Sequence, residues 1–349
     1  MELYQIVETN HQTMVASGKA QSDISVIAQR AGFCPVDIRT TSLSRKKAEV
    51  VKRQLVYAAG WARALRAVGR NSVLLVQCPF PHQQLTREAT LRLLKRRGVR
   101  LIAVVHDVEA LRKTYETAYY RREFRFMLEA ADVLIVHSEA MKRYFLGLGV
   151  AECRLVTLGV FDYLLDRSRL APKAMRPSVT VAGNLAPQKC GYLRELIGRI
   201  PVGLELYGSH FQEDTTRGGV VYHGALPPDA LPGAFTGGFG LVWDGPDVRS
   251  CTGDAGEYLR CNSPHKLSLY LASGLPVLIW REAAAAGFVE ERRVGIAIDS
   301  LEEIPALLGS MPEERYAELA ENAGREGERL SSGHYTAAAL REALERLGA

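Results

Sequence analysis

The sequence predicts an α/β protein made of two Rossmann-like domains that face each other across a cleft. Its 349 residues exceed what a single hydrophobic core usually serves, so two domains are expected. Short β-branched runs alternate with longer helix-period segments in both halves, the pattern of parallel sheets with helices on both faces. A composition of 47% hydrophobic and 24% charged residues is ordinary for a globular protein and indicates no extended disorder.

The first half has four clear strand-like runs. They cover residues 3–7, 72–77, 101–106 and 132–137. Apolar residues recur with helical period between them, in residues 46–68, 85–97 and 110–130. We place the N-terminal domain at residues 1–162 and its linker within residues 152–173, where a polar segment ends in Ala171-Pro172-Lys173.

A second series of strands follows the linker. It covers residues 178–182, 203–207, 220–223, 239–243, 276–280 and 295–298. We place the second domain at residues 174–330, ending in a helix over residues 312–330. A final helix, residues 334–347, either crosses back onto the first domain as part of a segment 334–349 or caps the chain end, and both alternatives stay open.

Charge and cysteine content exclude several classes of function. The formal net charge is +5, with basic clusters at residues 45–47 and 95–97, and a charge this small is typical of solvated helix faces. We expect no nucleic-acid partner, whereas an anionic donor or peripheral contact with a membrane surface fits the charge. The six cysteines are scattered without zinc-type spacing, so we expect no metal and no cofactor.

The N-terminus enters strand-like sequence without the regions of a signal peptide, and no apolar run approaches the ~20 residues that span a bilayer. We therefore expect a cytoplasmic protein.

Polar residues follow the first strand and the third. In parallel sheets, ligands bind beyond the carboxyl ends of the strands. Gly18 and Lys19 precede a helix expected to begin near Asp23, so they either hold a phosphate at its N-terminus or form a simple turn. His106 and Asp107 lie at the end of the strand predicted over residues 101–106, a position suited to a general base. In the alternative interpretation, the only role of Asp107 is to cap the following helix.

Strand ends in the second half carry glycines and a lysine. Gly183 and Asn184 follow a strand and lead to Lys189 at a helix start, a place where a phosphate can approach the backbone. Tyr207 ends the next strand and is followed by Gly208. Together these residues line one edge of the expected sheet.

The stretch from residue 258 to 277 is the most informative part of the chain. Pro264 suits a helix start because it lacks an N–H that would be unpaired there. The polar residues around it lie near the positive end of that helix, where a diphosphate or ribose is best held. They are Asn262, Ser263, His265 and Lys266. The leucines at 267, 269 and 271 are expected in the core.

The sequence at the start of this helix resembles that of a known protein family. Asn262-Ser263-Pro264-His265-Lys266-Leu267-Ser268-Leu269-Tyr270-Leu271 is similar to the donor-site signature of bacterial β-1,6-galactofuranosyltransferases. The same family includes the glucosyltransferase that extends N-acetylglucosamine on serine-rich adhesins. Further matching segments stand in the right order along the chain. They are Thr9-Asn10, Gly18-Lys19-Ala20, Gln77-Cys78-Pro79, residues 106–112 and Gly183-Asn184-Leu185.

The resemblance implies a GT-B fold, a UDP-sugar donor, no metal, and a homodimer or homotetramer. It also implies that Lys266, His265 and Asn262 hold the ribose and phosphates, helped by Gly183, Asn184 and Tyr207. Cys78 departs from the family pattern, in which the segment is more often Gln-Tyr-Pro, and that difference touches packing more than chemistry.

The expected reaction moves a hexose, glucose or galactose or galactofuranose, to a hydroxyl of a glycan, glycolipid or glycoprotein. Without an Asp-x-Asp pair, cations must stabilise the leaving UDP, and the candidates are Lys266, Lys189 and Lys19. No carboxylate occurs from residue 265 to 273, where retaining GT-B enzymes often have one, so we favour inversion.

The expected base is Asp107 or His106, with His11 and Asp23 as further candidates. Two alternatives stay open: a UDP-sugar epimerase of the same double-Rossmann shape, and a non-catalytic partner with a transferase fold.

Overall fold

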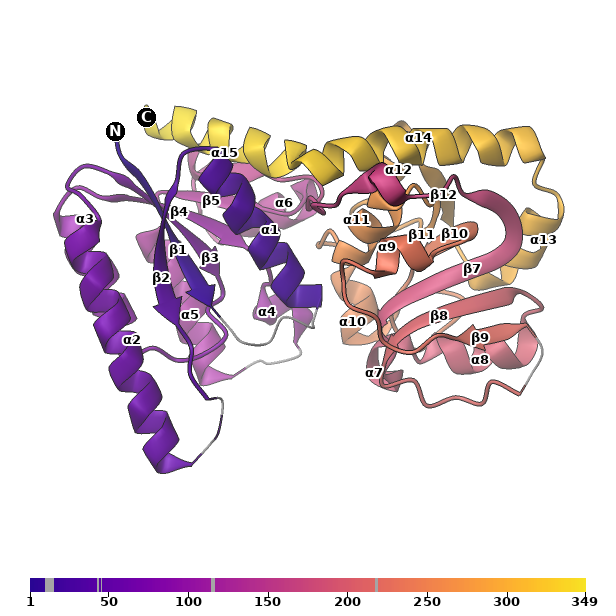
Figure 1. Cartoon of the computed structure of the whole chain (residues 1–349), viewed down its shortest axis with the longest axis horizontal. Coiled ribbons are helices and arrows are strands. Elements are labelled where there is room, and N and C mark those ends of the chain that lie inside the picture. The colour runs from indigo at the N-terminus through magenta and orange to yellow at the C-terminus, as the bar shows by residue number, and fades with distance from the viewer. Residues whose placement is uncertain (10–15, 43, 45, 114–116, 217–218) are drawn as a thin grey trace.

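The chain folds into two parallel six-stranded sheets that lie in separate halves of the molecule (Figure 1). The computed structural model describes residues 1–349 apart from 10–15, 43, 45, 114–116 and 217–218. The strand orders are β2-β1-β3-β4-β5-β6 and β12-β11-β10-β7-β8-β9. The predicted pair of Rossmann-like domains is confirmed.

The N-terminal sheet is covered by helices on both faces. Its strands are β1 (Leu3–Thr9), β2 (Cys34–Arg39), β3 (Val73–Cys78), β4 (Arg100–Val105), β5 (Val133–Val136) and β6 (Leu155–Thr157). Its helices are α1 (Ala16–Arg30), α2 (Lys47–Ala67), α3 (Arg87–Arg96), α4 (Glu109–Arg112), α5 (Ala118–Ala130) and α6 (Glu139–Gly147). Side chains of α2, α3, α5 and α6 fill one core and those of α1 the other, so each sheet face has its own apolar layer.

The C-terminal half has the same plan. Its strands are β7 (Ala174–Asn184), β8 (Gly203–Ser209), β9 (Val220–Tyr222), β10 (Gly237–Val242), β11 (Val277–Trp280) and β12 (Gly295–Ile298). Its helices are α7 (Pro187–Cys190), α8 (Tyr192–Arg199), α9 (Leu231–Ala234), α10 (Gly253–Tyr258), α11 (His265–Ala272), α12 (Ala286–Glu291), α13 (Ile304–Gly309) and α14 (Glu313–Ser332). Short 3-10 turns are η1 (Glu152–Arg154), η2 (Arg167–Arg169) and η3 (Leu301–Glu303).

Several boundaries differ from the sequence expectations. Helix α1 begins at Ala16 rather than near Asp23, because its polar first turns are held by tertiary contacts that periodicity does not reveal. Strand β2 was not predicted, since Pro35 and Asp37 disfavour a strand, but both are tolerated at the sheet edge. The helix expected over residues 110–130 is divided into α4 and α5.

The end of the chain returns to the N-terminal domain. Helix α15 (His334–Leu347) packs against α1, β5 and β6, directly after α14 on the C-terminal domain (Figure 1). Asp162 accepts hydrogen bonds from the backbone N–H groups of Tyr335 (3.1 Å) and Thr336 (2.6 Å) and so fixes the start of this helix. Within the described residues, no helix combines the length and apolarity needed to cross a membrane.

Each sheet has one point where the strand order reverses. In the C-terminal sheet the chain runs outward from β7 to β9 and then returns to the other side of β7 with β10. A crevice forms beyond the carboxyl ends of strands at such a reversal. It is bordered here by Gly183 and Asn184 at the end of β7 and by Asp244 just after β10.

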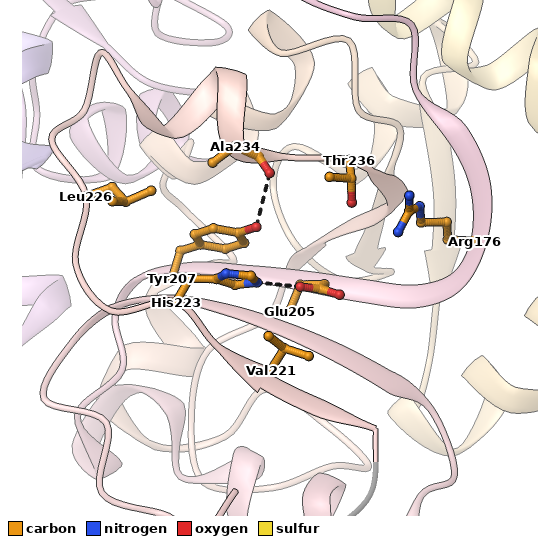
Figure 2. A pocket seen from close by; sticks show the side chains of 8 residues that line it. All are labelled: Arg176, Glu205, Tyr207, Val221, His223, Leu226, Ala234 and Thr236. Carbon is orange, nitrogen blue, oxygen red and sulfur yellow. Dashed lines mark hydrogen bonds and ion pairs between the residues drawn. The ribbon is translucent and has the colours of Figure 1, made fainter.

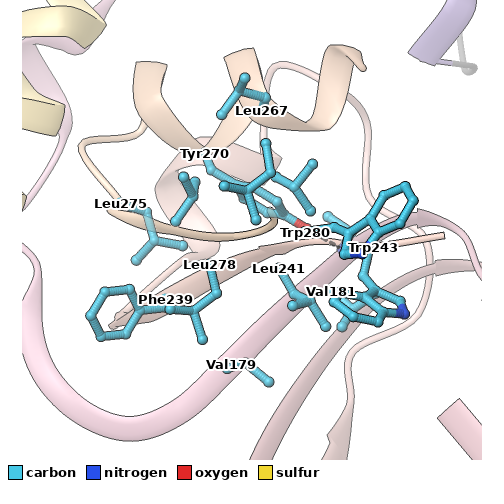
Figure 3. Close-up of a cluster of buried hydrophobic side chains, with 14 of the residues drawn as sticks. Val179, Val181, Phe239, Leu241, Trp243, Leu267, Tyr270, Leu275, Leu278 and Trp280 are labelled. Carbon is cyan, nitrogen blue, oxygen red and sulfur yellow. Dashed lines mark hydrogen bonds between the residues drawn. The ribbon is translucent and has the colours of Figure 1, made fainter. Parts of the chain in front are cut away.

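A dense apolar core supports this crevice (Figure 3). Trp243 and Trp280 meet edge to face with ring centroids 6.5 Å apart. The Tyr270 hydroxyl accepts a hydrogen bond from the Ala182 N–H at 2.8 Å and ties α11 to β7. A Cβ on Gly240 would lie 2.3 Å from the Tyr270 ring, so only glycine permits this packing. The predicted core leucines of α11 are buried, as expected.

Candidate functional site

A buried ionic cluster occupies the crevice of the C-terminal sheet. The Lys266 ammonium donates to Asp244 Oδ1 at 2.8 Å and to the Trp243 carbonyl at 3.0 Å. The side chains of Lys266 and Asp244 are only 8% and 6% exposed. Lys189 approaches Asp244 Oδ2 at 3.8 Å and is 42% exposed. Two cations and one carboxylate thus meet at the end of β10, leaving a net positive site.

The carboxylate of Asp244 keeps Lys266 charged. Burial acts to lower the pKa of Lys266, but the adjacent Asp244 carboxylate outweighs it and raises the pKa above its usual value. The loop around Asp244 is itself fixed, because the Gly245 N–H donates to the Lys189 carbonyl at 2.7 Å. Gly245 has φ 111°, a conformation that favours glycine. Sequence reasoning missed Asp244, although its place directly after a strand was a usable signal.

The mouth of α11 carries buried polar atoms without partners. Asn262 Oδ1, Ser263 Oγ and His265 Nε2 accept or donate no hydrogen bond within the described part of the chain. Buried polar atoms are normally hydrogen-bonded, and leaving one unpaired costs about 1–3 kcal/mol. The first N–H groups of α11 lie at the same end of the helix. These buried atoms leave hydrogen-bonding capacity at the mouth of α11 that a polar ligand could use.

The end of β7 leaves room beside this cluster. Gly183 has φ 127°, and a Cβ built there would meet no atom within 4 Å. Asn184 Oδ1 accepts from the Ala186 N–H at 3.0 Å and shapes the turn into α7. The predicted residues Gly183, Asn184, Lys189 and Lys266 therefore border one crevice.

Asp107 faces this crevice from the N-terminal domain. Its carboxylate pairs with Arg112 at 2.7 Å and is 34% exposed. Burial raises the pKa of Asp107 to about 6, even though Arg112 and, from the other domain, Lys189 act to lower it. A carboxyl group titrating near neutral pH and open to the crevice is suited to general-base chemistry.

His106 is held differently. Its Nε2 lies 2.7 Å from Gln77 Oε1, and its ring stacks on Phe161 with centroids 5.6 Å apart. Burial, with His137 and His265 nearby, lowers the pKa of His106 to about 3. A base of such low pKa takes up a proton poorly near pH 7.

Three imidazoles surround Phe161 where the domains meet. His137 contacts the Phe161 ring edge to face at 4.8 Å and its Nε2 lies 2.8 Å from the Val105 carbonyl. His265 lies 6.1 Å from the same ring. Burial lowers the pKa of both His137 and His265 to about 4, so all three rings are neutral at pH 7. Sequence reasoning missed His137 and Phe161, although the place of His137 at the end of the strand predicted over residues 132–137 was a usable signal.

Lys19 makes no ion pair with Asp244, but its charge acts on His265 at the mouth of α11 and, after burial, lowers the pKa of that ring. Its ammonium contacts Asp23 at 2.7 Å, the Leu164 carbonyl at 2.8 Å and Asp229 of the C-terminal domain at 3.4 Å. Gly18 lies beside it in the first turn of α1. Burial raises the pKa of Asp23, which Lys19 opposes. His11 lies outside the described residues.

Tyr207 is separate from the crevice. Its hydroxyl donates to the Ala234 carbonyl at 3.1 Å, and its ring stacks on His223 with centroids 4.3 Å apart. Both side chains line a cavity on the face of the sheet (Figure 2). Among the described residues, no three His, Cys, Asp or Glu side chains are grouped as metal ligands.

Two family models cover most of the chain. The "Glucosyltransferase 3-like, N-terminal domain" matches residues 3–160, and the corresponding C-terminal domain matches residues 179–343. Each family model covers one of the two sheets, so the two matches together include both domains.

Individual relatives agree with these matches. The β-1,6-galactofuranosyltransferase WbbI of Escherichia coli K12 is 32% identical over 260 residues, which are 73% of this chain and 74% of WbbI. Glucosyltransferase 3 of Streptococcus gordonii is 26% identical over 327 residues, 93% of either chain.

A solved structure supports the fold. Anabaena HepE, crystallised with UDP-glucose, superposes with a TM-score of 0.60 at 13% identity, covering 100% of this chain and 99% of HepE. The GT-B fold expected from the sequence is confirmed.

Proposed function

This chain belongs to the glucosyltransferase 3-like family of glycosyltransferases, and from that premise we propose that it transfers a hexose from a UDP-sugar. The hexose is glucose, galactose or galactofuranose, and the acceptor is a hydroxyl of a glycan, glycolipid or glycoprotein. The observation that carries the proposal is the buried Asp244–Lys266 pair, extended by Lys189, at the carboxyl ends of β7 and β10.

On the donor side, Lys189 and Lys266 hold the diphosphate. Asp244 keeps Lys266 in one position, and Lys189 is exposed enough to reach a ligand. The helix N-terminus of α11 adds a partial positive charge. Asn262 Oδ1 can accept from a ribose hydroxyl and Ser263 Oγ can donate to a phosphate, since neither atom has a hydrogen-bond partner among the described residues. These fixed charges stabilise UDP as it leaves. We propose that no metal is needed.

On the acceptor side, Asp107 is the general base. Its carboxylate removes the proton of the acceptor hydroxyl, whose oxygen then forms a bond to the anomeric carbon as the bond to the UDP oxygen breaks. This direct displacement inverts the anomeric configuration. Asp107 is favoured over His106 because its pKa, about 6, lies closer to neutrality and because His106 Nε2 is already paired with Gln77 Oε1.

A thermal-shift panel tests the donor. We expect UDP and UDP-hexoses to raise the melting temperature of the wild-type protein with or without EDTA, and GDP and ADP to raise it less. Lys189→Ala should lose most of this shift. Arg194→Ala, a change at an exposed arginine of α8, should keep it. Shifts by GDP or ADP alone, or none at all, would refute the UDP-sugar assignment.

A transfer assay tests the reaction. Products formed from UDP-hexoses and a panel of glycan acceptors are analysed by NMR for the anomeric configuration. We expect an inverted linkage. A retained configuration would contradict direct displacement, and epimerised UDP-sugar without acceptor would favour an epimerase.

A further inference from the structure

The cavity of Figure 2 lies on the C-terminal domain away from the crevice. It has a volume of about 430 Å³, within the range of about 300–1,000 Å³ that small-ligand sites occupy. Glu205 pairs in register with Thr180, four residues before Asn184 at the end of β7. A strand rises about 3.3 Å per residue, so along the strands Glu205 lies roughly 13 Å, and Tyr207, which pairs with Ala182, roughly 7 Å from that end.

The strands build the cavity wall by their alternation. Glu205 and Tyr207 are two residues apart on β8, and Val221 and His223 bear the same relation on and after β9. Residues two apart on a strand point to one face of the sheet. Figure 2 shows Tyr207, His223 and Glu205 side by side on this face, with Arg176 on the opposite side of the cavity.

The polar groups of the cavity have spare hydrogen-bonding capacity. Arg176, from the start of β7, forms no ion pair with any described carboxylate, although it faces the cavity. Glu205 Oε2 lies 2.5 Å from His223 Nε2, and its other oxygen, Oε1, has no hydrogen bond from the described residues. A guanidinium and a carboxylate oxygen are therefore both available to a ligand.

The fixed parts of the cavity define the shape of that ligand. Tyr207 is buried and is held by its bond to the Ala234 carbonyl and by stacking on His223, so the partly exposed His223 ring is the aromatic face that a ligand can reach. Val221 adds an apolar contact. A guanidinium recognises a carboxylate through two parallel hydrogen bonds, whereas a carboxylate accepts from hydroxyl groups. One small ring that carries both a carboxylate and hydroxyl groups would pair with both the Arg176 guanidinium and the free Glu205 oxygen.

We propose that this cavity binds an acidic sugar unit, a uronic acid, at a site distinct from the donor crevice. Arg176 holds the sugar carboxylate, Glu205 accepts from its hydroxyls, and the ring packs on His223, which Tyr207 supports from behind. The site gives the C-terminal domain a second contact with acidic glycans. It does not depend on which UDP-sugar the crevice takes.

Saturation-transfer difference NMR with sodium glucuronate tests the site, with glucose as the neutral control. We expect the wild-type protein to bind glucuronate more tightly than glucose. Arg176→Ala should weaken glucuronate binding about tenfold or more, because it removes a charged hydrogen bond. Arg194→Ala, at an exposed arginine on α8, should bind as the wild type does. Glu205→Gln should weaken binding of both sugars.

Saturating UDP separates this proposal from the function of the crevice. We expect UDP to leave glucuronate binding unchanged. Displacement of glucuronate by UDP would place it in the crevice and overturn the second site. Equal affinity for glucose and glucuronate, unchanged binding in Arg176→Ala, or no saturation transfer from the wild-type protein would overturn it as well. None of these results depends on sugar transfer.

Discussion

The carboxyl ends of the two sheets carry groups of different electrostatic character. On the C-terminal side, Lys266 and Asp244 form a fixed ion pair that is almost fully buried. On the N-terminal side, His106 is neutral at pH 7 and Asp107 titrates near neutrality. A permanent charge suits the binding of an anion, and a group with a pKa near the working pH suits proton transfer. In the proposed reaction, the C-terminal side therefore binds the donor and the N-terminal side activates the acceptor.

Removing the proposed base should have the largest effect. Asp107→Asn is expected to lower kcat about 100- to 10,000-fold, the usual contribution of a general base, with little change in KM for the UDP-sugar. Steady-state kinetics between pH 5 and 8 checks this. In the wild type the rate should rise with pH through about 6, because the deprotonated carboxylate is active. Asp254→Asn, at an exposed carboxylate of α10, is the control and should keep the wild-type rate.

If Asp107→Asn keeps both the rate and its pH dependence, the base lies elsewhere and the division between the two sides fails.

Breaking the buried pair should be the next largest effect. Lys266→Met leaves the Asp244 carboxylate buried without its closest cation and is expected to lower the free energy of unfolding by about 3 kcal/mol. Urea unfolding measures this. The double variant Lys266→Met with Asp244→Asn removes both charges and should recover much of the loss. Arg199→Met, which breaks the exposed pair with Glu195, should cost no more than about 0.5 kcal/mol.

A double variant no more stable than Lys266→Met would mean that the cost of the single change does not come from an unpaired Asp244 charge.

Protonation of the three imidazoles where the domains meet should lower the free energy of unfolding in acid. The pKa of His106 is about 3 and those of His137 and His265 about 4, all below the ordinary value of 6.5. The unfolded chain therefore binds protons that the folded chain does not, and stability is lost as pH falls below 6.5. These three imidazoles should contribute a loss of about 2 kcal/mol between pH 7 and 5.5.

Glu8, with a pKa of about 7, and Asp107 and Asp162, with pKa values of about 6, oppose this loss because these carboxyls take up protons in the folded state over the same range. Urea unfolding at several pH values checks the imidazole contribution, and His137→Gln should reduce it. A pH dependence that is the same in the wild type and in His137→Gln would show that the His137 ring does not remain neutral in the fold.

The smallest expected effect concerns the bridge between Lys19 and Asp229. Asp229 is 81% exposed, so Asp229→Asn should cost only about 0.2–1 kcal/mol. Thermal unfolding at low and high salt measures it. The difference from wild type should shrink in about 1 M salt, where screening acts over about 3 Å. A larger loss that is insensitive to salt would mean that Lys19 has more than a bridging role.

Local sequence patterns were sufficient for most of the fold. Alternation of β-branched runs with helical periods located both sheets, because each pattern reflects burial of one segment against its neighbours. The same reasoning failed at β2, where Pro35 and Asp37 are acceptable only because that strand lies at the sheet edge. The early start of α1 was hidden for a related reason, since contacts of Lys19 with distant residues stabilise its first turns.

The sequence by itself determined the fold class, the polar mouth of α11 and the presence of His106 and Asp107 at a strand end. These follow from local spacing and from the rule that strand ends carry ligands. Only the tertiary structure decided that Lys266 pairs with Asp244, that Lys19 bridges the domains and that Tyr207 belongs to a separate cavity. The physical reason is that ion pairing and burial depend on which strands are neighbours in the sheet, and the strand order is not contained in any single segment.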